Sequence, residues 1–202
     1  MKLLNNILFT DIYDDSEIMP NKNKIILGIS SFWIFNLLSH SYYKQLYFLT
    51  YNLSLISIAS PIYWYNYKNN SIYHKFDKYL VIICLIYLFI NENIINFLCN
   101  FIFIISSYIS SSLYSIDNNY NLQLYSHLIF RFFTFKLIYD YIDINLIYFL
   151  LITLENFIFN IYLIYDINQN CNNDLIVYIK YSTKLIILIG FNEYFYYQME
   201  LI

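Results

Sequence analysis

Two stretches decide the fold class: "FLCNFIFII" at residues 97–105 and "LIYFLLITL" at residues 146–154. Both are apolar on every side of a helix, whereas a strand of a membrane β-barrel alternates apolar and polar residues over about ten positions. We therefore expect helices, although the abundant Ile, Tyr and Phe favour strands in water. Similar apolar runs, separated by short polar breaks, cover residues 25–41, 45–63, 78–91, 94–114, 122–139, 144–165 and 175–191.

Composition places the chain in a membrane. Of its 202 residues, 59% are hydrophobic and 12% are charged, whereas soluble domains carry about 25% charged residues. Several runs reach the roughly 17–25 residues that a helix needs to cross a bilayer, while the run at 78–91 needs help from its flanks. The sequence predicts an all-α polytopic transmembrane helix bundle of about seven spans, with six as the alternative. The bundle covers residues 25–202 and follows a polar, acidic, cytoplasmic tail at residues 1–24.

Several classes of function are disfavoured. The net charge of −3 leaves no basic face for nucleic acid, so the expected partners are the lipid bilayer and other membrane proteins. Cys84, Cys99 and Cys171 form no CxxC motif, and Gly-rich phosphate loops, GxSxG and HExxH are absent from the sequence. We expect no cofactor from these patterns. The excess of Ile, Asn, Tyr and Phe is typical of A+T-rich genomes, including those of some giant viruses.

The basic residues predict an orientation. With seven spans, five lysines fall on the side of the N-terminus, and the short loops of the opposite side hold Lys44 and Lys136. The five are Lys22, Lys24, Lys68, Lys75 and Lys78. Because cytoplasmic loops carry the excess of Lys and Arg, we expect the N-terminus in the cytoplasm.

Three ionisable residues fall near the middle of expected spans: Arg131, Glu155 and Lys184. A charge in the hydrocarbon core requires a partner, so we expect Glu155 to pair with Arg131, Lys184 or both. Asn156 and Asn160, one turn apart, are expected to hydrogen-bond across helices. These groups are interpreted as structural ties; the alternative is an ion or proton relay in a small transporter or channel subunit.

The stretch "SPIYWYNYKNNSIYHKFDKY" at residues 60–79 brings chemistry-bearing side chains together at a membrane surface. In the seven-span arrangement Ser60, His74 and Asp77 approach the same face as His127. A Ser near the end of one span, followed by an Asp that opens the next, resembles the superfamily of hemolysin III proteins, progestin and adipoQ receptors and alkaline ceramidases. The resemblance rests on "SPIYW", "KFDKY" and the seven spans.

This resemblance implies a zinc ion, held by three His, that activates water for lipid amide hydrolysis. Ser60 and Asp77 carry over, but Trp64 stands where the family has a zinc-binding His, and Lys180 and Lys184 replace two His of the last span. The resemblance therefore implies a degenerate or re-purposed member.

A different zinc site is a further alternative, in which His74, Asp77 and His127 supply the ligands. The competing interpretation is an interfacial belt, in which five aromatic residues lie at headgroup depth and Ser60 merely ends a helix before Pro61. The five are Tyr63, Trp64, Tyr65, Tyr67 and Tyr73. The sequence favours a non-catalytic structural or partner-binding membrane protein, and an enzyme of the lipid-hydrolase type is the alternative.

Overall fold

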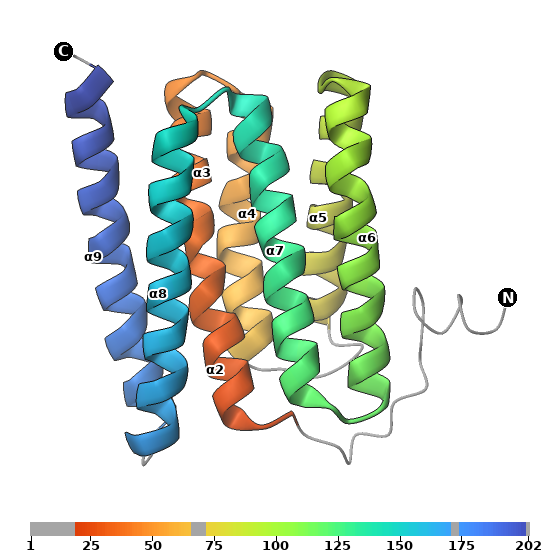
Figure 1. The fold of residues 1–202 in the computed structure, drawn as a ribbon, viewed down its shortest axis with the longest axis vertical. Coiled ribbons are helices and arrows are strands. Elements are labelled where there is room, and N and C mark those ends of the chain that lie inside the picture. The colour runs from red at the N-terminus through yellow and green to blue at the C-terminus, as the bar shows by residue number, and fades with distance from the viewer. Residues whose placement is uncertain (1–18, 66–71, 171–173, 201–202) are drawn as a thin grey trace, which may run out of the picture.

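The computed structural model describes residues 19–65, 72–170 and 174–200, and every regular element within these ranges is a helix (Figure 1). The elements are α2 (Asn21–Ser30), the 3₁₀ turn η1 (Ser31–Trp33), α3 (Ile34–Tyr43), α4 (Tyr47–Tyr65), α5 (Ile72–Asn91), α6 (Ile94–Ile116), α7 (Tyr120–Ile142), α8 (Leu146–Asn170) and α9 (Asp174–Glu200). Since α2, η1 and α3 form one continuous helical rod, the described chain contains seven rods. The predicted all-α class is confirmed.

The rods run alternately up and down, so that α2 begins at the lower end of Figure 1 and α9 ends at the upper end. Most boundaries lie close to the apolar runs. The short run at 78–91 is part of a longer helix that begins at Ile72, because polar residues before the run also adopt helical structure. Of the predicted tail, residues 1–18 lie outside the described residues, and α2 begins at Asn21.

The rod formed by α2, η1 and α3 lies at the centre of the bundle. It packs against α4, α7, α8 and α9, and it buries Ile25, Leu27, Trp33 and Leu37. Its burial follows from its sequence, since apolar or small residues occur on almost every side of it. A central helix of this kind places any polar residue that it carries inside the protein.

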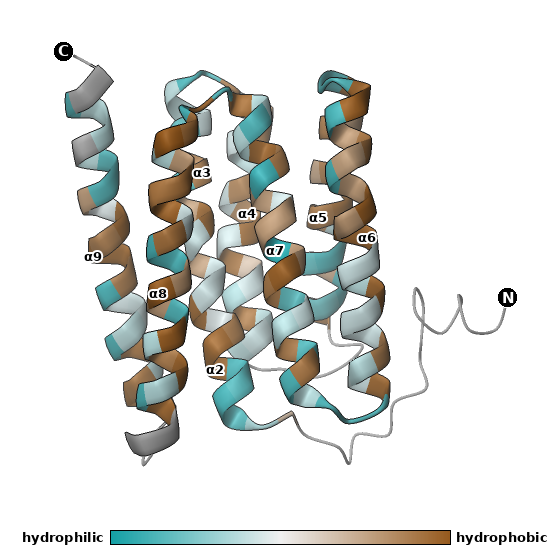
Figure 2. Ribbon diagram, viewed as in Figure 1, coloured by the Kyte–Doolittle hydropathy of each residue, from teal (hydrophilic) through white to brown (hydrophobic). Residues whose placement is uncertain are grey.

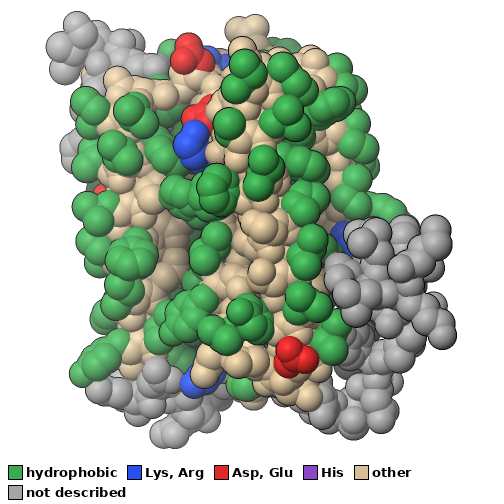
Figure 3. Space-filling view, turned by 45° about the vertical axis from the view of Figure 1, so that its right-hand side comes forward, with side chains coloured by type: hydrophobic (Ala, Val, Ile, Leu, Met, Phe, Trp, Pro, Cys, Tyr) green, Lys and Arg blue, Asp and Glu red, His purple; other side chains and the backbone are tan. Residues whose placement is uncertain are grey.

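The outer surface of the bundle is apolar. Large side chains such as Ile95, Ile147, Phe157 and Ile176 are exposed, and brown, hydrophobic positions follow the outer helices in Figure 2. In the face drawn in Figure 3, hydrophobic side chains cover much of the surface, and only a few charged side chains lie among them. Soluble monomers rarely expose apolar patches of more than a few hundred Å².

Four segments of the described chain are long and apolar enough to cross a membrane: Asn21–Tyr43, Ile94–Ile116, Leu146–Ile167 and Leu175–Gln198. The helices α4, α5 and α7 are not among these four; α5 contains Lys75, Asp77 and Lys78, and α7 contains Arg131 and Lys136. The apolar helices and their exposed side chains are compatible with an integral membrane protein.

Candidate functional site

Arg131 lies at the centre of a buried polar cluster. This Arg131 cluster consists of Ser30 and Ser31 of the central rod, Ser60 of α4, Asp77 of α5 and Arg131 of α7. One nitrogen of Arg131, Nη1, donates to the carbonyl of Leu27 at 2.6 Å and to the hydroxyl of Ser30. The other, Nη2, donates to the hydroxyl of Ser31 at 2.8 Å. The guanidinium therefore donates three hydrogen bonds to the central rod.

The local geometry of the central rod makes the Leu27 carbonyl available. At the start of the 3₁₀ turn, the backbone N–H of Ser31 bonds to the carbonyls of Gly28 and Ile29. In an α-helix it would bond to Leu27, four residues back. The Leu27 oxygen accepts instead from the hydroxyls of Ser30 and Ser31, at 3.1 Å and 2.9 Å, and from Arg131.

Asp77 and Ser60 extend the cluster towards α4 and α5. The hydroxyls of Ser31 and Ser60 lie 3.2 Å apart, and Ser60 also hydrogen-bonds to the Asp77 carboxylate. Arg131 attracts Asp77 electrostatically, although the structure describes no direct ion pair between them. The hydrogen bonds described for Ser60 therefore go to a serine and a carboxylate, and not to a histidine that would activate it as a nucleophile.

Both candidate histidines pack against aromatic rings in the same region of the bundle. His74 stacks on Tyr63 at 4.8 Å between ring centroids, and His127 meets the edge of Trp64 at 4.5 Å. The Trp64 ring also lies 5.6 Å from the guanidinium carbon of Arg131. The structure thus brings Ser60, His74, Asp77 and His127 into one region.

Two details of the interpretation of residues 60–79 are wrong. Tyr63 and Trp64 are buried, with 5% and 3% of their surfaces exposed, so these two belong to the core, whereas Tyr65 and Tyr73 of the expected belt are exposed. Tyr67 lies outside the described residues. Ser60 does not end a helix, since α4 continues through Pro61 to Tyr65.

The described residues do not group into a metal site. In the part of the chain that the structure describes, no three His, Cys, Asp or Glu side chains are grouped closely enough to hold a metal ion. The set His74, Asp77 and His127 therefore lacks the geometry that the zinc alternative requires, and no chemistry is derived through zinc.

In the structure, Glu155 and Lys184 contact residues other than the partners that the sequence predicts for them. Glu155 accepts a hydrogen bond from Asn192 of α9, and the predicted pairing of Glu155 with Arg131 or Lys184 is wrong. Lys184 is exposed, and its ammonium lies over aromatic rings.

The two asparagines of α8 were expected to bond across helices. Instead, the side-chain amide of Asn160 donates to the carbonyl oxygen of Asn156 at 2.8 Å and also to the Asn156 side chain. Both bonds lie within one helix, because residues four apart share a helix face. These contacts stabilise α8 locally and tie it to no neighbouring helix.

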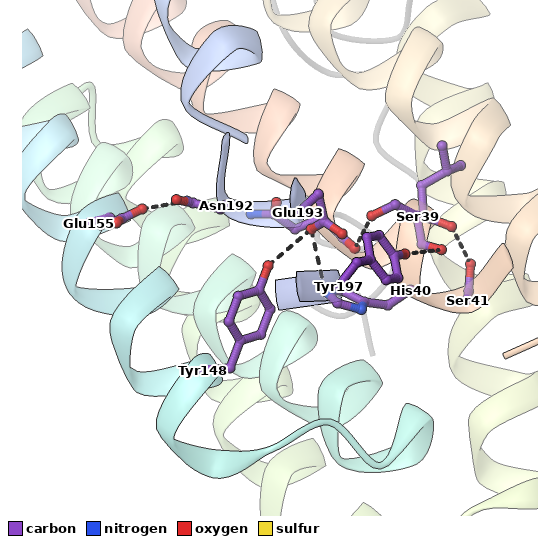
Figure 4. A network of polar contacts seen from close by, with 10 residues as sticks. Ser39, His40, Ser41, Tyr148, Glu155, Asn192, Glu193 and Tyr197 are labelled. Carbon is purple, nitrogen blue, oxygen red and sulfur yellow. Dashed lines mark hydrogen bonds and ion pairs between the residues drawn. The ribbon is translucent and has the colours of Figure 1, made fainter. Parts of the chain in front are cut away.

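A second buried polar cluster lies near the opposite end of the bundle (Figure 4). This His40 cluster consists of His40 of α3, Tyr148 of α8 and Glu193 of α9. The Nε2 atom of His40 lies 3.3 Å from Oε1 of Glu193, and the Tyr148 hydroxyl donates to the same oxygen at 3.2 Å. The rings of Tyr148 and Tyr196 meet His40 edge-on at 5.2 Å and 4.5 Å.

Sequence reasoning missed the His40 cluster for two reasons. His40 lies near the end of the expected run at 25–41 and was given no role, and the last span was expected to end at residue 191, although α9 continues to Glu200. The spacing of buried residues along α9 contains a signal that could have located Glu193. Tyr181, Leu185, Ile189 and Glu193 follow one another at intervals of four, so Glu193 continues the buried face of α9.

Chemically, both clusters join one carboxylate, one basic side chain and hydroxyl groups from several helices. Such networks fix the register of helices inside a bundle. A comparison of the chain with protein-family models, curated proteins and solved structures finds no match.

Proposed function

We propose that this chain is a multi-pass integral membrane protein of seven spans, with its N-terminus in the cytoplasm, that acts as a structural or partner-binding component of its membrane and not as a catalyst. The observation that carries the proposal is the binding of Arg131 to the central rod through Leu27, Ser30 and Ser31.

The placement of Arg131 supports a structural role. A charge inside a membrane bundle is stabilised only when neighbouring helices satisfy it. Arg131 of α7 reaches the backbone and hydroxyls of the central rod, while Asp77 supplies negative charge from α5. The side chain thereby ties three parts of the bundle together, and three of its five N–H donors are engaged by the central rod. A transporter or an enzyme would require such a group to face a substrate or an aqueous path.

The topology has a direct test. Tyr43, at the end of α3, and Asp117, after α6, lie at opposite ends of the bundle and are exposed. In a chain whose native cysteines are replaced by Ser, each position is changed to Cys in sealed vesicles of known sidedness. A membrane-impermeant thiol reagent should label Tyr43→Cys only from the lumenal or outer side and Asp117→Cys only from the cytoplasmic side. The reverse pattern would overturn the orientation, and labelling of both from one side would overturn the span count.

A second candidate is a degenerate or re-purposed lipid hydrolase of the hemolysin III and ceramidase type. The observation that favours it is the hydrogen bond between Ser60 and Asp77, since these are the two residues that the resemblance carries over. Against it, Trp64 stands where the resemblance places a zinc-binding His, and its ring lies 5.6 Å from the guanidinium carbon of Arg131.

The experiment that separates the two candidates is a hydrolysis assay on amide- and ester-linked lipids. The purified wild-type protein is compared with Ser60→Ala and Asp77→Asn, which are checked for folding by their thermal transitions. We expect the wild type to hydrolyse these lipids no faster than the two variants do. Turnover that both substitutions abolish would refute the non-catalytic proposal and support the hydrolase.

A further inference from the structure

Two lysines of α9 differ in how their charges are satisfied. Lys180 lies 4.0 Å from the carboxylate of Asp166 on α8. Lys184, one turn further along the helix, is exposed and has no ion pair among the described residues. Its ammonium lies 5.7 Å from the ring centroid of Tyr162 and 5.1 Å from that of Tyr181. Aromatic faces attract a cation but do not neutralise it.

The depth of Lys184 prevents it from reaching the lipid headgroups. At about 1.5 Å per residue, the helix rises about 15 Å between Asp174 and Lys184, and about 21 Å more to Gln198. Both distances are longer than a lysine side chain. Because Leu175–Gln198 is apolar enough to span a membrane, the ammonium lies near the middle of the hydrocarbon core. A lipid phosphate at either surface is therefore too far away to pair with it.

The surface around Lys184 is apolar and faces outwards. On α9, Ile187 is 55% exposed, and on α8, Phe157 and Ile161 are 63% and 52% exposed. In Figure 1 these two helices form one side of the bundle. A lysine in such a surface is costly in lipid alone, and burial against a helix that carries an opposite charge removes the cost.

The described part of a second copy does not supply that charge, because half-buried Glu155 near the middle of α8 already accepts a hydrogen bond from Asn192. Among the residues that the structure describes, the exposed carboxylates are Asp117, Asp140 and Asp143. Asp117 and Asp143 cap the ends of α6 and α7, and Asp140, near the end of α7, pairs with Lys136. A copy placed side by side in the membrane would therefore bring no exposed carboxylate to the depth of Lys184.

We propose that the outer face of α8 and α9 binds a transmembrane helix of another membrane protein that carries an Asp or Glu at mid-span, with that carboxylate on the ammonium of Lys184. The inference rests on the proposed partner-binding function and names the chemistry of the partner.

The test uses a synthetic transmembrane peptide built of Leu and Ala with one central Asp, and a control peptide with Leu at that position. Association with the full chain in nanodiscs is measured by energy transfer to a dye on the protein. We expect the wild type to prefer the Asp peptide by about tenfold. Lys184→Met should abolish this preference. Lys180→Met is the matched control, because Lys180 already pairs with Asp166, and this variant should still prefer the Asp peptide. Lys184→Arg, which keeps the positive charge, should also prefer it.

Several results would overturn the inference. One is equal binding of the two peptides by the wild type. Another is a preference for the Asp peptide that persists in Lys184→Met. Self-association of the peptide-free protein that depends on Lys184 would assign the face to a second copy, and enrichment of anionic lipid that depends on Lys184 would assign it to lipid. The thermal transition of Lys184→Met, expected to match that of the wild type, separates loss of binding from loss of fold. Failure here leaves the non-catalytic proposal intact, since that proposal is tested by turnover that requires Ser60 and Asp77, and its topology is tested by the labelling of Tyr43→Cys and Asp117→Cys.

Discussion

Replacing Arg131 by Met should destabilise the bundle more than any other single neutralisation of a charge on α7. Met keeps much of the apolar stem but removes the hydrogen bonds to Leu27, Ser30 and Ser31. Interhelical hydrogen bonds in membranes contribute about 0.6 kcal/mol on average and about 1.7 kcal/mol at most. Three such bonds give an expected loss of about 2–5 kcal/mol in the free energy of unfolding. The loss also leaves Asp77 without the attraction of the guanidinium.

The free energy of unfolding is measured by titrating SDS into mixed micelles that contain the purified protein. Asp77→Asn and the double variant complete a double-mutant cycle. Because the unpaired carboxylate is part of the cost of Arg131→Met, the double variant should be less destabilised than the sum of the single variants by about 0.5–3 kcal/mol.

A surface cation of the same helix provides the control. Lys136 forms a half-exposed pair with Asp140 one turn away, so Lys136→Met should change the free energy of unfolding by no more than about 0.5 kcal/mol. If Arg131→Met were as mild as this control, or if its effect simply added to that of Asp77→Asn, the description of Arg131 as the tie between helices would be wrong.

Two further predictions use the same titration. Glu193→Leu removes the acceptor of the Tyr148 hydroxyl and the partner of His40, and should cost about 1–3 kcal/mol; a change below about 0.5 kcal/mol would show that the His40 cluster contributes little to stability. Gly28→Ala should cost about 1–3 kcal/mol, because a Cβ atom there would lie 2.7 Å from a ring carbon of Tyr178. Gly190→Ala, where a Cβ atom meets nothing within 4 Å, should instead be neutral or stabilise by up to about 1 kcal/mol.

The helices themselves were predictable because hydropathy acts locally. The runs at 94–114 and 144–165 correspond to Ile94–Ile116 and Leu146–Asn170. The ends were less predictable where polar residues continue a helix, as they do before residue 78 and after residue 191. Hydropathy reports burial in lipid, whereas helix formation also depends on the intrinsic propensities of residues outside the apolar run.

The partners of buried charges were not predictable from depth. Glu155 was correctly recognised as a polar residue within the sixth run, but its partner is the neutral amide of Asn192. Residues at similar depth meet only when their helices are rotated so that both side chains face the same interface. The rotation of each helix depends on how the whole bundle packs.

The sequence by itself therefore determined that this chain is all-helical and suited to a membrane, because its apolar blocks have no polar side and occur at lengths close to a bilayer's thickness. It also identified Arg131 as a charge that needs a partner, and Ser60 and Asp77 as candidate site residues. Only the tertiary structure decided that these three meet in one network, while Lys184 remains on the outside. The physical reason is that hydropathy depends on the residues of one segment alone, whereas contacts inside a bundle depend on the packing and rotation of all of its helices together.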